Sequence, residues 1–220
     1  MKKLIAVAAA LVVTSAAAFA LDITAGARGN FNIGAGTTLE DAPSSLDYDG
    51  NMGAGFGIYG NFGLLELGGG SLGVQPEVNM NFNNGINYST YGTSISFEDI
   101  TVDIPVLVTF TYPVMDALSI GGGIGPYLSI PFAFDEVYGG TKYSEYFDIK
   151  GSMNFGLAFD VNAAYKLGPG SIVFDARYMM DLTPTKIQLK PKDSDIDWSD
   201  PEEVLTRRML TLGVGYQIKF

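Results

Sequence analysis

Apolar and polar residues alternate along the last twelve positions, 209–220, and the alternation is strict from Leu210 onward. One face of this segment carries Leu210, Leu212, Val214, Tyr216, Ile218 and Phe220. The other face carries Thr211, Gly213, Gly215, Gln217 and Lys219. A period of two is the signature of a β-strand with one apolar and one polar face. Such a strand needs a different environment on each side.

The same alternation recurs in seven earlier segments, at 23–33, 52–64, 72–82, 100–112, 118–130, 153–165 and 172–178. Most are close to the roughly 9 to 11 residues that a tilted strand needs to cross a membrane. Tight turns are predicted at 66–70, 113–116 and 167–170, and long loops at 36–50, 84–99, 133–148 and 183–204. Short turns at one end and long loops at the other are typical of outer-membrane barrels.

A soluble barrel with its two faces exchanged is the main alternative fold. Soluble surfaces are usually rich in Lys and Glu, whereas the polar face here is mostly Gly, Asn, Thr and Ser. Two groups of aromatic residues are expected to form girdles at the membrane interfaces. They are Tyr112, Tyr165 and Phe220 at the turn end, and Phe82, Phe97, Phe132 and Phe147 at the loop end. The sequence therefore predicts an all-β, eight-stranded antiparallel transmembrane barrel of up-and-down topology, surrounded by outer-membrane lipids.

The first twenty residues have the features of a signal peptide. Lys2 and Lys3 precede an apolar run at 4–13, and Ala18-Phe19-Ala20 is a small-x-small cleavage motif. The apolar run is shorter than the roughly 20 residues that a spanning helix needs. We expect cleavage after Ala20, which leaves 21–220 as a single barrel domain.

Composition argues against several function classes. The chain has no Cys and no His, which removes thiolate metal sites and the commonest general base and metal ligand. A net charge of −11 argues against binding to nucleic acid. Most of this charge falls in the four predicted long loops. We therefore expect a protein that is not an enzyme and has no cofactor.

Two short segments match known functional motifs only in part. The segment 68–73 matches both a dinucleotide fingerprint and G-x-S-x-G, but no helix follows it and no histidine exists to activate Ser71. The segment 193–197 begins like a calcium loop, but Trp198 stands where Gly should be and Val204 where the bidentate Glu should be. We interpret the first as a tight turn and the second as a solvated acidic loop, with weak cation binding as an open alternative.

Five charged residues fall on the polar, inward face of the predicted strands, about five to seven residues from the turn end. They are Arg28, Glu77, Asp160, Asp175 and Arg177. At similar depth in a barrel just wide enough to be filled by side chains, they are expected to pair. The network is interpreted as structural, and the alternative is a gate that opens when the pairs exchange partners.

Several short motifs resemble those of the outer-membrane β-barrel family often labelled porin family or PorT-like. In chain order they are Val74-Gln75-Pro76-Glu77-Val78, Ile104-Pro105-Val106-Leu107, Gly125-Pro126-Tyr127, Asp175-Ala176-Arg177-Tyr178 and the last strand. Met80-Asn81 departs from the Tyr-Ser pair common in the family, and Met179-Met180-Asp181 replaces the usual Gly-Leu. The resemblance implies the outer membrane of a diderm bacterium. It also implies a closing strand, with Tyr216, Ile218 and Phe220, that the barrel-assembly machinery reads.

The expected function is a structural or surface-interaction role through acidic outer loops that bind an external or envelope partner. A small-solute gated pore is one alternative, and an accessory role in secretion or envelope assembly is another. The protein is expected to be a monomer.

Overall fold

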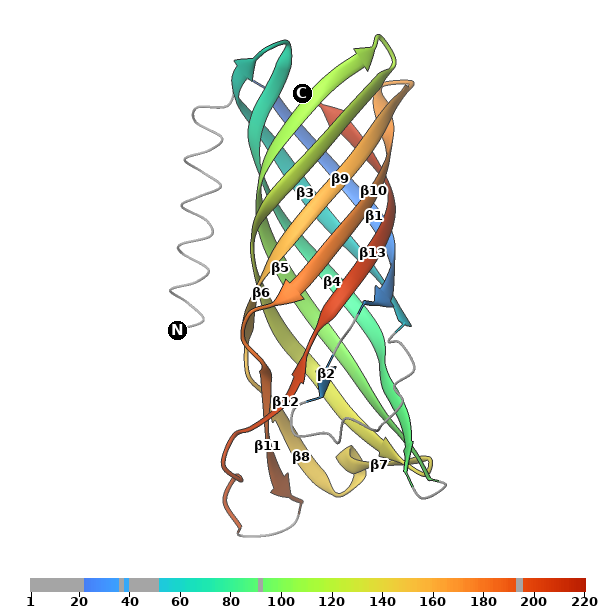
Figure 1. Ribbon diagram of the computed structural model, residues 1–220, viewed down its shortest axis with the longest axis vertical. Coiled ribbons are helices and arrows are strands. Elements are labelled where there is room, and N and C mark those ends of the chain that lie inside the picture. The colour runs from blue at the N-terminus through green and yellow to red at the C-terminus, as the bar shows by residue number, and fades with distance from the viewer. Residues whose placement is uncertain (1–21, 36–37, 40–51, 91–92, 193–195) are drawn as a thin grey trace.

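Eight long strands wind around one axis in the computed structural model, which describes residues 22–35, 38–39, 52–90, 93–192 and 196–220 (Figure 1). The predicted signal peptide, its cleavage point after Ala20 and most of the first predicted loop lie outside the described residues. So do Asp193 and Asp195 of the calcium-like segment.

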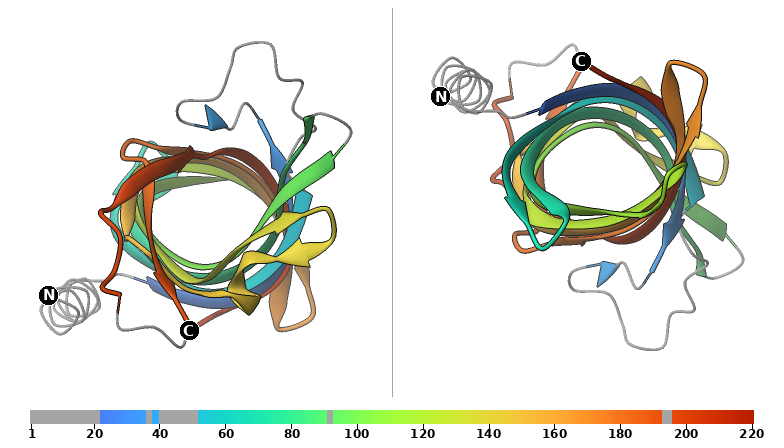
Figure 2. Two further views of the ribbon diagram at one scale, coloured as in Figure 1. Left: turned by 90° about the horizontal axis from the view of Figure 1, so that it is seen from below. Right: turned by 90° about the horizontal axis from the view of Figure 1, so that it is seen from above.

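The barrel strands are β1 (Asp22–Gly34), β3 (Met52–Leu67), β4 (Gly70–Thr90), β5 (Thr93–Met115), β6 (Leu118–Tyr138), β9 (Asn154–Leu167), β10 (Gly170–Asp181) and β13 (Arg208–Lys219). Each pairs antiparallel with the next in this order. Strands β1 and β13 close the ring, from Thr24 opposite Lys219 to Gly34 opposite Met209. Seen along the axis, the strands form a closed ring (Figure 2). The predicted eight-stranded antiparallel barrel is confirmed.

Tight turns lie at one end of the barrel, which we call the turn end. Gly68 and Gly69 connect β3 to β4 with φ of 59° and 84°, a left-handed conformation that residues with a Cβ rarely adopt. The C-terminus lies at the same end (Figure 1). The opposite end, which carries the long connections, is called the outer end.

The outer end contains more regular structure than the sequence predicted. A four-stranded sheet, the outer sheet, is formed by β2 (Thr38–Leu39), β12 (Glu202–Thr206), β11 (Thr185–Pro191) and β8 (Phe147–Gly151), in that order. The short strand β7 (Thr141–Lys142) pairs with β6, and the 3-10 helix η1 (Tyr143–Glu145) follows it. Strands β4, β5 and β6 have 21, 23 and 21 residues.

The prediction that 84–99 and 133–148 are loops is therefore wrong for most of their length, and 183–204 contains β11 and the start of β12. The ladder between β5 and β6 continues as far as Ile95 opposite Tyr138. Strands β4, β5 and β6 are thus about twice as long as the roughly ten residues that a strand needs to cross a membrane. Their extra length pairs strand to strand at the outer end.

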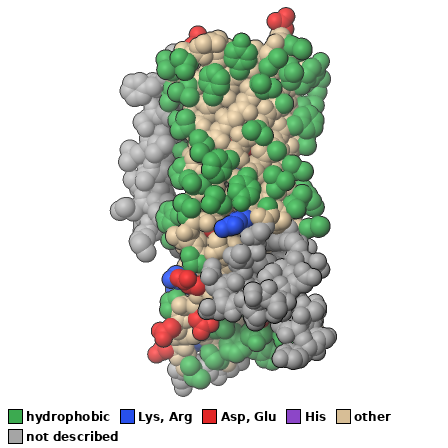
Figure 3. All heavy atoms as spheres, in the orientation of Figure 1, with side chains coloured by type: hydrophobic (Ala, Val, Ile, Leu, Met, Phe, Trp, Pro, Cys, Tyr) green, Lys and Arg blue, Asp and Glu red, His purple; other side chains and the backbone are tan. Residues whose placement is uncertain are grey.

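Large apolar side chains cover the outer face of the barrel wall (Figure 3). Ile58, Val161 and Phe174 are 64%, 63% and 56% exposed. Apolar groups exposed over so large an area are unfavourable in water and suit a hydrocarbon environment. None of the described helical segments is long and apolar enough to cross a membrane.

The three residues predicted for the turn-end girdle are exposed, as a girdle requires, whereas two of the four predicted for the outer end do not lie exposed on the barrel wall. Tyr112, Tyr165 and Phe220 are exposed at the turn end, and Phe82 and Phe132 are exposed on the other side. Phe97, in contrast, is buried, with its ring 5.7 Å from that of Phe134. Because β5 continues past the apolar wall, its alternation turns Phe97 inward. Phe147 lies on β8 of the outer sheet, where its ring stacks on Tyr143.

Candidate functional site

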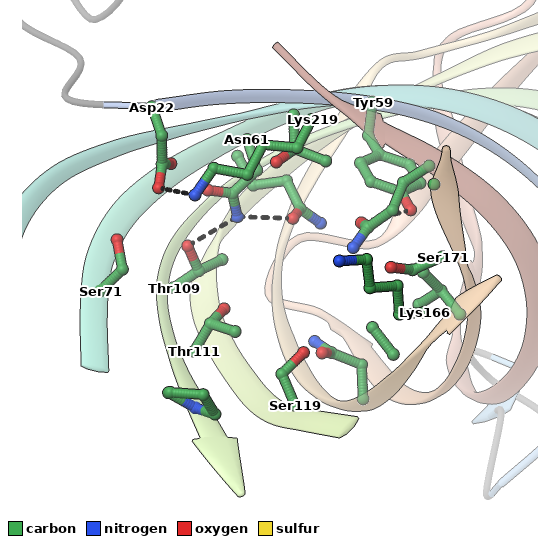
Figure 4. Close-up of a pocket in the computed structure, with 18 of the residues that line it drawn as sticks. Asp22, Tyr59, Asn61, Ser71, Thr109, Thr111, Ser119, Lys166, Ser171 and Lys219 are labelled. Atoms are coloured by element: carbon green, nitrogen blue, oxygen red, sulfur yellow. Dashed lines mark hydrogen bonds and ion pairs between the residues drawn. The ribbon is translucent and has the colours of Figure 1, made fainter. Parts of the chain in front are cut away.

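The barrel interior contains nearly all the buried polar side chains of the described residues. These side chains form layers that follow one another from the turn end to the outer end. The first layer is an open cavity of about 630 Å³, the vestibule (Figure 4). Each of the eight barrel strands contributes one uncharged, half-buried polar side chain to its wall. This vestibule ring consists of Thr24, Asn61, Ser71, Thr111, Ser119, Asn162, Ser171 and Gln217.

Charged groups occupy the mouth of the vestibule. Lys219 pairs with Asp22 at 2.6 Å, and Glu66 and Lys166 also line the cavity. Asn61 donates to Gln75 Oε1 at 2.9 Å and to Thr109 Oγ1 at 3.0 Å (Figure 4). The wall therefore combines a ring of polar groups with a few small apolar residues such as Ala164 and Val173, and its rim carries charges of both signs.

The second layer forms the floor of the vestibule and contains all five inward charges predicted from the sequence. Arg28 contacts Glu77 at 2.6 Å and Asp175 at 3.3 Å. Arg177 donates to both carboxylate oxygens of Glu77, at 2.6 and 2.8 Å, and to Asp160 at 2.9 Å. All five are at most 8% exposed. The structure thus brings the five residues together in one network, which we call the inner charge network.

Glu77 is the centre of this network, because both guanidinium groups bind it. Gln75 and Asn79 also donate to its carboxylate, at 2.7 and 3.0 Å. The Arg28 guanidinium lies 6.0 Å from the centre of the Tyr59 ring. The network links β1, β4, β9 and β10, so it connects opposite parts of the barrel wall.

Asparagine side chains from β1 and β4 form the third layer. Asn30 donates to Asn81 at 2.9 Å, and Asn32 donates to Asn81 at 3.1 Å and to Asn83 at 3.2 Å. Asn81 in turn donates to Asp103 at 2.8 Å. An apolar cluster of Leu107, Tyr127, Ala158 and Met179, from β5, β6, β9 and β10, fills the other side of the lumen.

Glycines on β3 make the asparagine layer possible. Gly53, Gly55 and Gly57 lie between β1 and β4, and a Cβ at each would overlap the Oδ1 atom of Asn83, Asn81 or Asn79 respectively. The asparagines can therefore lie across β3 and reach β1. This local packing explains why the second predicted strand has glycine at alternate inward positions.

A fourth layer, the outer charge network, was missed by the sequence analysis. Arg207, 3% exposed, contacts Asp99 at 3.2 Å and Asp181 at 3.4 Å, and donates to Ser129 at 2.5 Å. Ser129 donates to Asp103 at 2.5 Å. The Tyr127 hydroxyl donates to Asp181.

A signal for this network was present in the sequence. Arg207 lies two residues before Met209 and four before Thr211, so alternation places it on the same inward face. Arg208 lies on the outward face. The last strand was predicted to begin at Met209, and Asp99 was predicted to lie in a loop. Extending both strands would have placed the two residues in the lumen.

The fifth layer is apolar. Phe97 of β5 and Phe134 of β6 pack with Ile187 of β11 and Leu205 of β12, and Ile149 and Leu189 lie against this cluster. The outer sheet therefore packs on the extended barrel strands through a small hydrophobic core. Its solvent side carries charges, including Lys186 paired with Glu203 at 2.7 Å.

Several other described charges of the outer end are exposed to solvent. Lys142 donates to Glu98 at 2.7 Å, and this hydrogen bond raises the pKa of Lys142. Asp197 and Trp198 of the calcium-like segment are exposed. Among the described residues, no group of three or more His, Cys, Asp or Glu could hold a metal ion. Ser71 of the G-x-S-x-G match lies at the start of β4, in the vestibule wall, after the predicted turn.

The three residues of the predicted assembly signal lie at the turn end. Tyr216 and Ile218 face outward on β13, and Phe220, 78% exposed, follows that strand. The Phe220 backbone N–H donates to the Ile23 carbonyl at 2.8 Å. Recognition of these residues by an assembly machinery stays a prediction.

No protein-family model matches the sequence, and no curated protein matches it either. Solved structures do match. Outer membrane protein OprG of Pseudomonas aeruginosa is similar with a TM-score of 0.60 and 13% identity, over 91% of this chain and 97% of OprG. A major outer membrane protein of Thermus thermophilus gives a TM-score of 0.52 and 16% identity, over 89% of this chain and 99% of that chain. The fold is thus that of small outer-membrane β-barrels.

Proposed function

We propose that this chain is a non-enzymatic protein of the bacterial outer membrane that acts at the cell surface through its folded outer end. One observation carries the proposal. Beyond the vestibule, buried side chains fill the lumen from the layer of Glu77 to the layer of Phe97. The outer end forms a sheet with its own hydrophobic core. A barrel arranged in this way is suited to presenting a rigid surface rather than to conducting solutes.

The described part of the outer end supports this role because it forms a sheet and carries charged groups. Strands from three separate connections form the outer sheet, and exposed groups such as Lys150, Glu202 and Trp198 project from this end. A preorganised surface loses less entropy on binding than a flexible loop does. The partner is an external or envelope component, and the barrel serves as its anchor.

Two measurements test the proposal. Purified protein in planar bilayers is expected to give conductance close to the empty-membrane background. The full chain is expected to bind cells or matrix. A variant in which residues 184–205 are replaced by a short turn should keep the barrel, because the two charge networks remain, but should lose this binding. Stepwise conductance of the full chain would contradict the proposal, as would binding that survives the replacement.

A gated pore is the second candidate, and the inner charge network favours it. Arg28 and Arg177 each bind two carboxylates, and Glu77 is shared by both. Such pairs can exchange partners through small movements, and the vestibule already opens the turn end of the lumen. An accessory role in secretion follows only from the resemblance of the sequence motifs to the PorT-like family.

We also propose that Phe220 is part of an assembly signal read in the cell. Phe220→Ala should lower the amount of folded protein in the outer membrane several-fold, with little effect on refolding of the purified chain into detergent. The measurement is the heat-dependent mobility of the protein in outer-membrane fractions. Phe132→Ala removes an equally exposed aromatic residue at the other end of the barrel and serves as control. Equal outer-membrane levels for both variants would contradict the role of Phe220.

A further inference from the structure

The vestibule is a blind cavity, because its floor is closed by the inner charge network. Arg28, Asp160 and Asp175 of that network line its inner end, and all three are buried. Arg177 and Glu77 lie behind them, 1% and 2% exposed. A solute that enters from the turn end therefore meets a closed wall rather than a channel.

Between the charged mouth and the charged floor, the polar groups of the wall are uncharged. The vestibule ring places hydroxyl and amide groups around the whole circumference. Among the described residues, the hydroxyl groups of Thr111, Ser119 and Ser171 have no hydrogen-bond partner, and Figure 4 shows all three around the same open space. These groups can both donate to and accept from a ligand.

Charges near the cavity are balanced or out of reach. Asp22 and Lys219 neutralise each other, and Glu66 and Lys166 add one charge of each sign at the mouth. The four charges that line the mouth sum to zero, so a strongly charged ligand gains no net attraction from them. A volume of about 630 Å³ lies within the usual range of small-molecule sites.

We propose that the vestibule binds a neutral, polyhydroxylated solute of the size of a disaccharide, held by hydrogen bonds from the vestibule ring. Sugar hydroxyl groups match the wall because each can donate and accept. Binding to the isolated protein does not depend on the surface role proposed above. We expect the vestibule to face the periplasm, because outer-membrane barrels have their short turns on that side. This orientation alone rests on the outer-membrane location proposed above. The sugar can be a free solute or the end of a cell-wall glycan.

The test uses the full barrel in a detergent without a sugar headgroup, such as lauryldimethylamine oxide, because maltoside headgroups would compete. N,N′-diacetylchitobiose and maltose are titrated by ligand-detected NMR, with glutamate and spermidine as charged probes. We expect saturable binding of the disaccharides and at least tenfold weaker binding of both charged probes. Tighter binding of the chitobiose than of maltose indicates a glycan end, and the reverse order indicates a free sugar. Either order supports the proposal.

Variants separate the site from unspecific association. Thr111→Val, Ser119→Ala and Ser171→Ala together remove three hydroxyl groups at nearly constant volume and should weaken disaccharide binding about tenfold or more. Ser144→Ala, Ser152→Ala and Thr183→Val remove three hydroxyl groups at the outer end and should leave binding unchanged. Heat-dependent mobility checks that both variants fold. If the triple variant fails to fold, Ser119→Phe, which fills the cavity, replaces it and should abolish binding. The proposal is wrong if neither disaccharide saturates, if a vestibule variant binds like wild type, or if a charged probe binds more tightly.

Discussion

Replacing Arg177 by Ala is expected to lower the stability of the barrel by about 3 to 5 kcal/mol, because it leaves buried carboxylates without their partner. Arg177 is 1% exposed and binds both Glu77 and Asp160. The measurement is the temperature at which the heat-dependent mobility shift and the β-sheet circular dichroism signal are lost. Lys166→Ala, which removes an exposed lumen-facing cation of β9, should change this temperature little.

The double variant Arg177→Ala with Glu77→Ala tests whether the loss comes from the orphaned charge. Removing Glu77 as well should recover part of the stability, since the carboxylate that Arg177 binds through two hydrogen bonds is then absent. Recovery should be incomplete because Asp160 remains and Arg28 loses its closest partner. Bilayer conductance should stay at background in both variants. A clear rise in conductance for the single variant, with stability unchanged, would favour the gated pore.

Arg207→Ala should have an effect of similar size, about 3 to 5 kcal/mol or more, because three buried aspartates depend on a single cation. Asp99 and Asp181 contact Arg207 directly, and Asp103 is connected to it through Ser129. Removing the guanidinium leaves these carboxylates close together in a region shielded from water.

The neighbouring residue provides a matched control for this variant. Arg208 is exposed on the outward face, so Arg208→Ala changes the same charge one position along the chain without opening the lumen. Its unfolding temperature should stay close to that of the wild type. Equal losses for the two variants would show that Arg207 has no special role in the interior.

Alternation alone predicted the barrel and the inner charge network. Because side chains alternate strictly between the two faces of a strand, Arg28, Glu77 and Arg177 had to face the lumen once the apolar face was assigned to lipid. The distance of each residue from the nearest predicted tight turn gave its depth in the barrel. The same reasoning failed for Arg207 and Phe97 only because the strands were ended too early.

The outer sheet could not be predicted in the same way. Its strands are short, and β2 has only two residues, so no local pattern identifies them. Leu39 pairs with Leu205, and Ile187 pairs with Gly151. These partners are far apart in the sequence and are aligned only by the barrel that lies beneath them. The asparagine layer likewise depends on contacts between β1 and β4 across the glycines of β3, which a linear pattern does not reveal.

The strands of the outer sheet come from distant parts of the chain, and this affects the order in which the protein folds. Strand β2 follows the first barrel strand and β12 directly precedes the last, so closure of the β1–β13 seam brings these two strands together. Pairing between such distant segments is slow, because a long stretch of chain must be ordered first. The outer sheet should therefore be the last element to form. A ligand or antibody that recognises its surface would distinguish completed molecules from open folding intermediates.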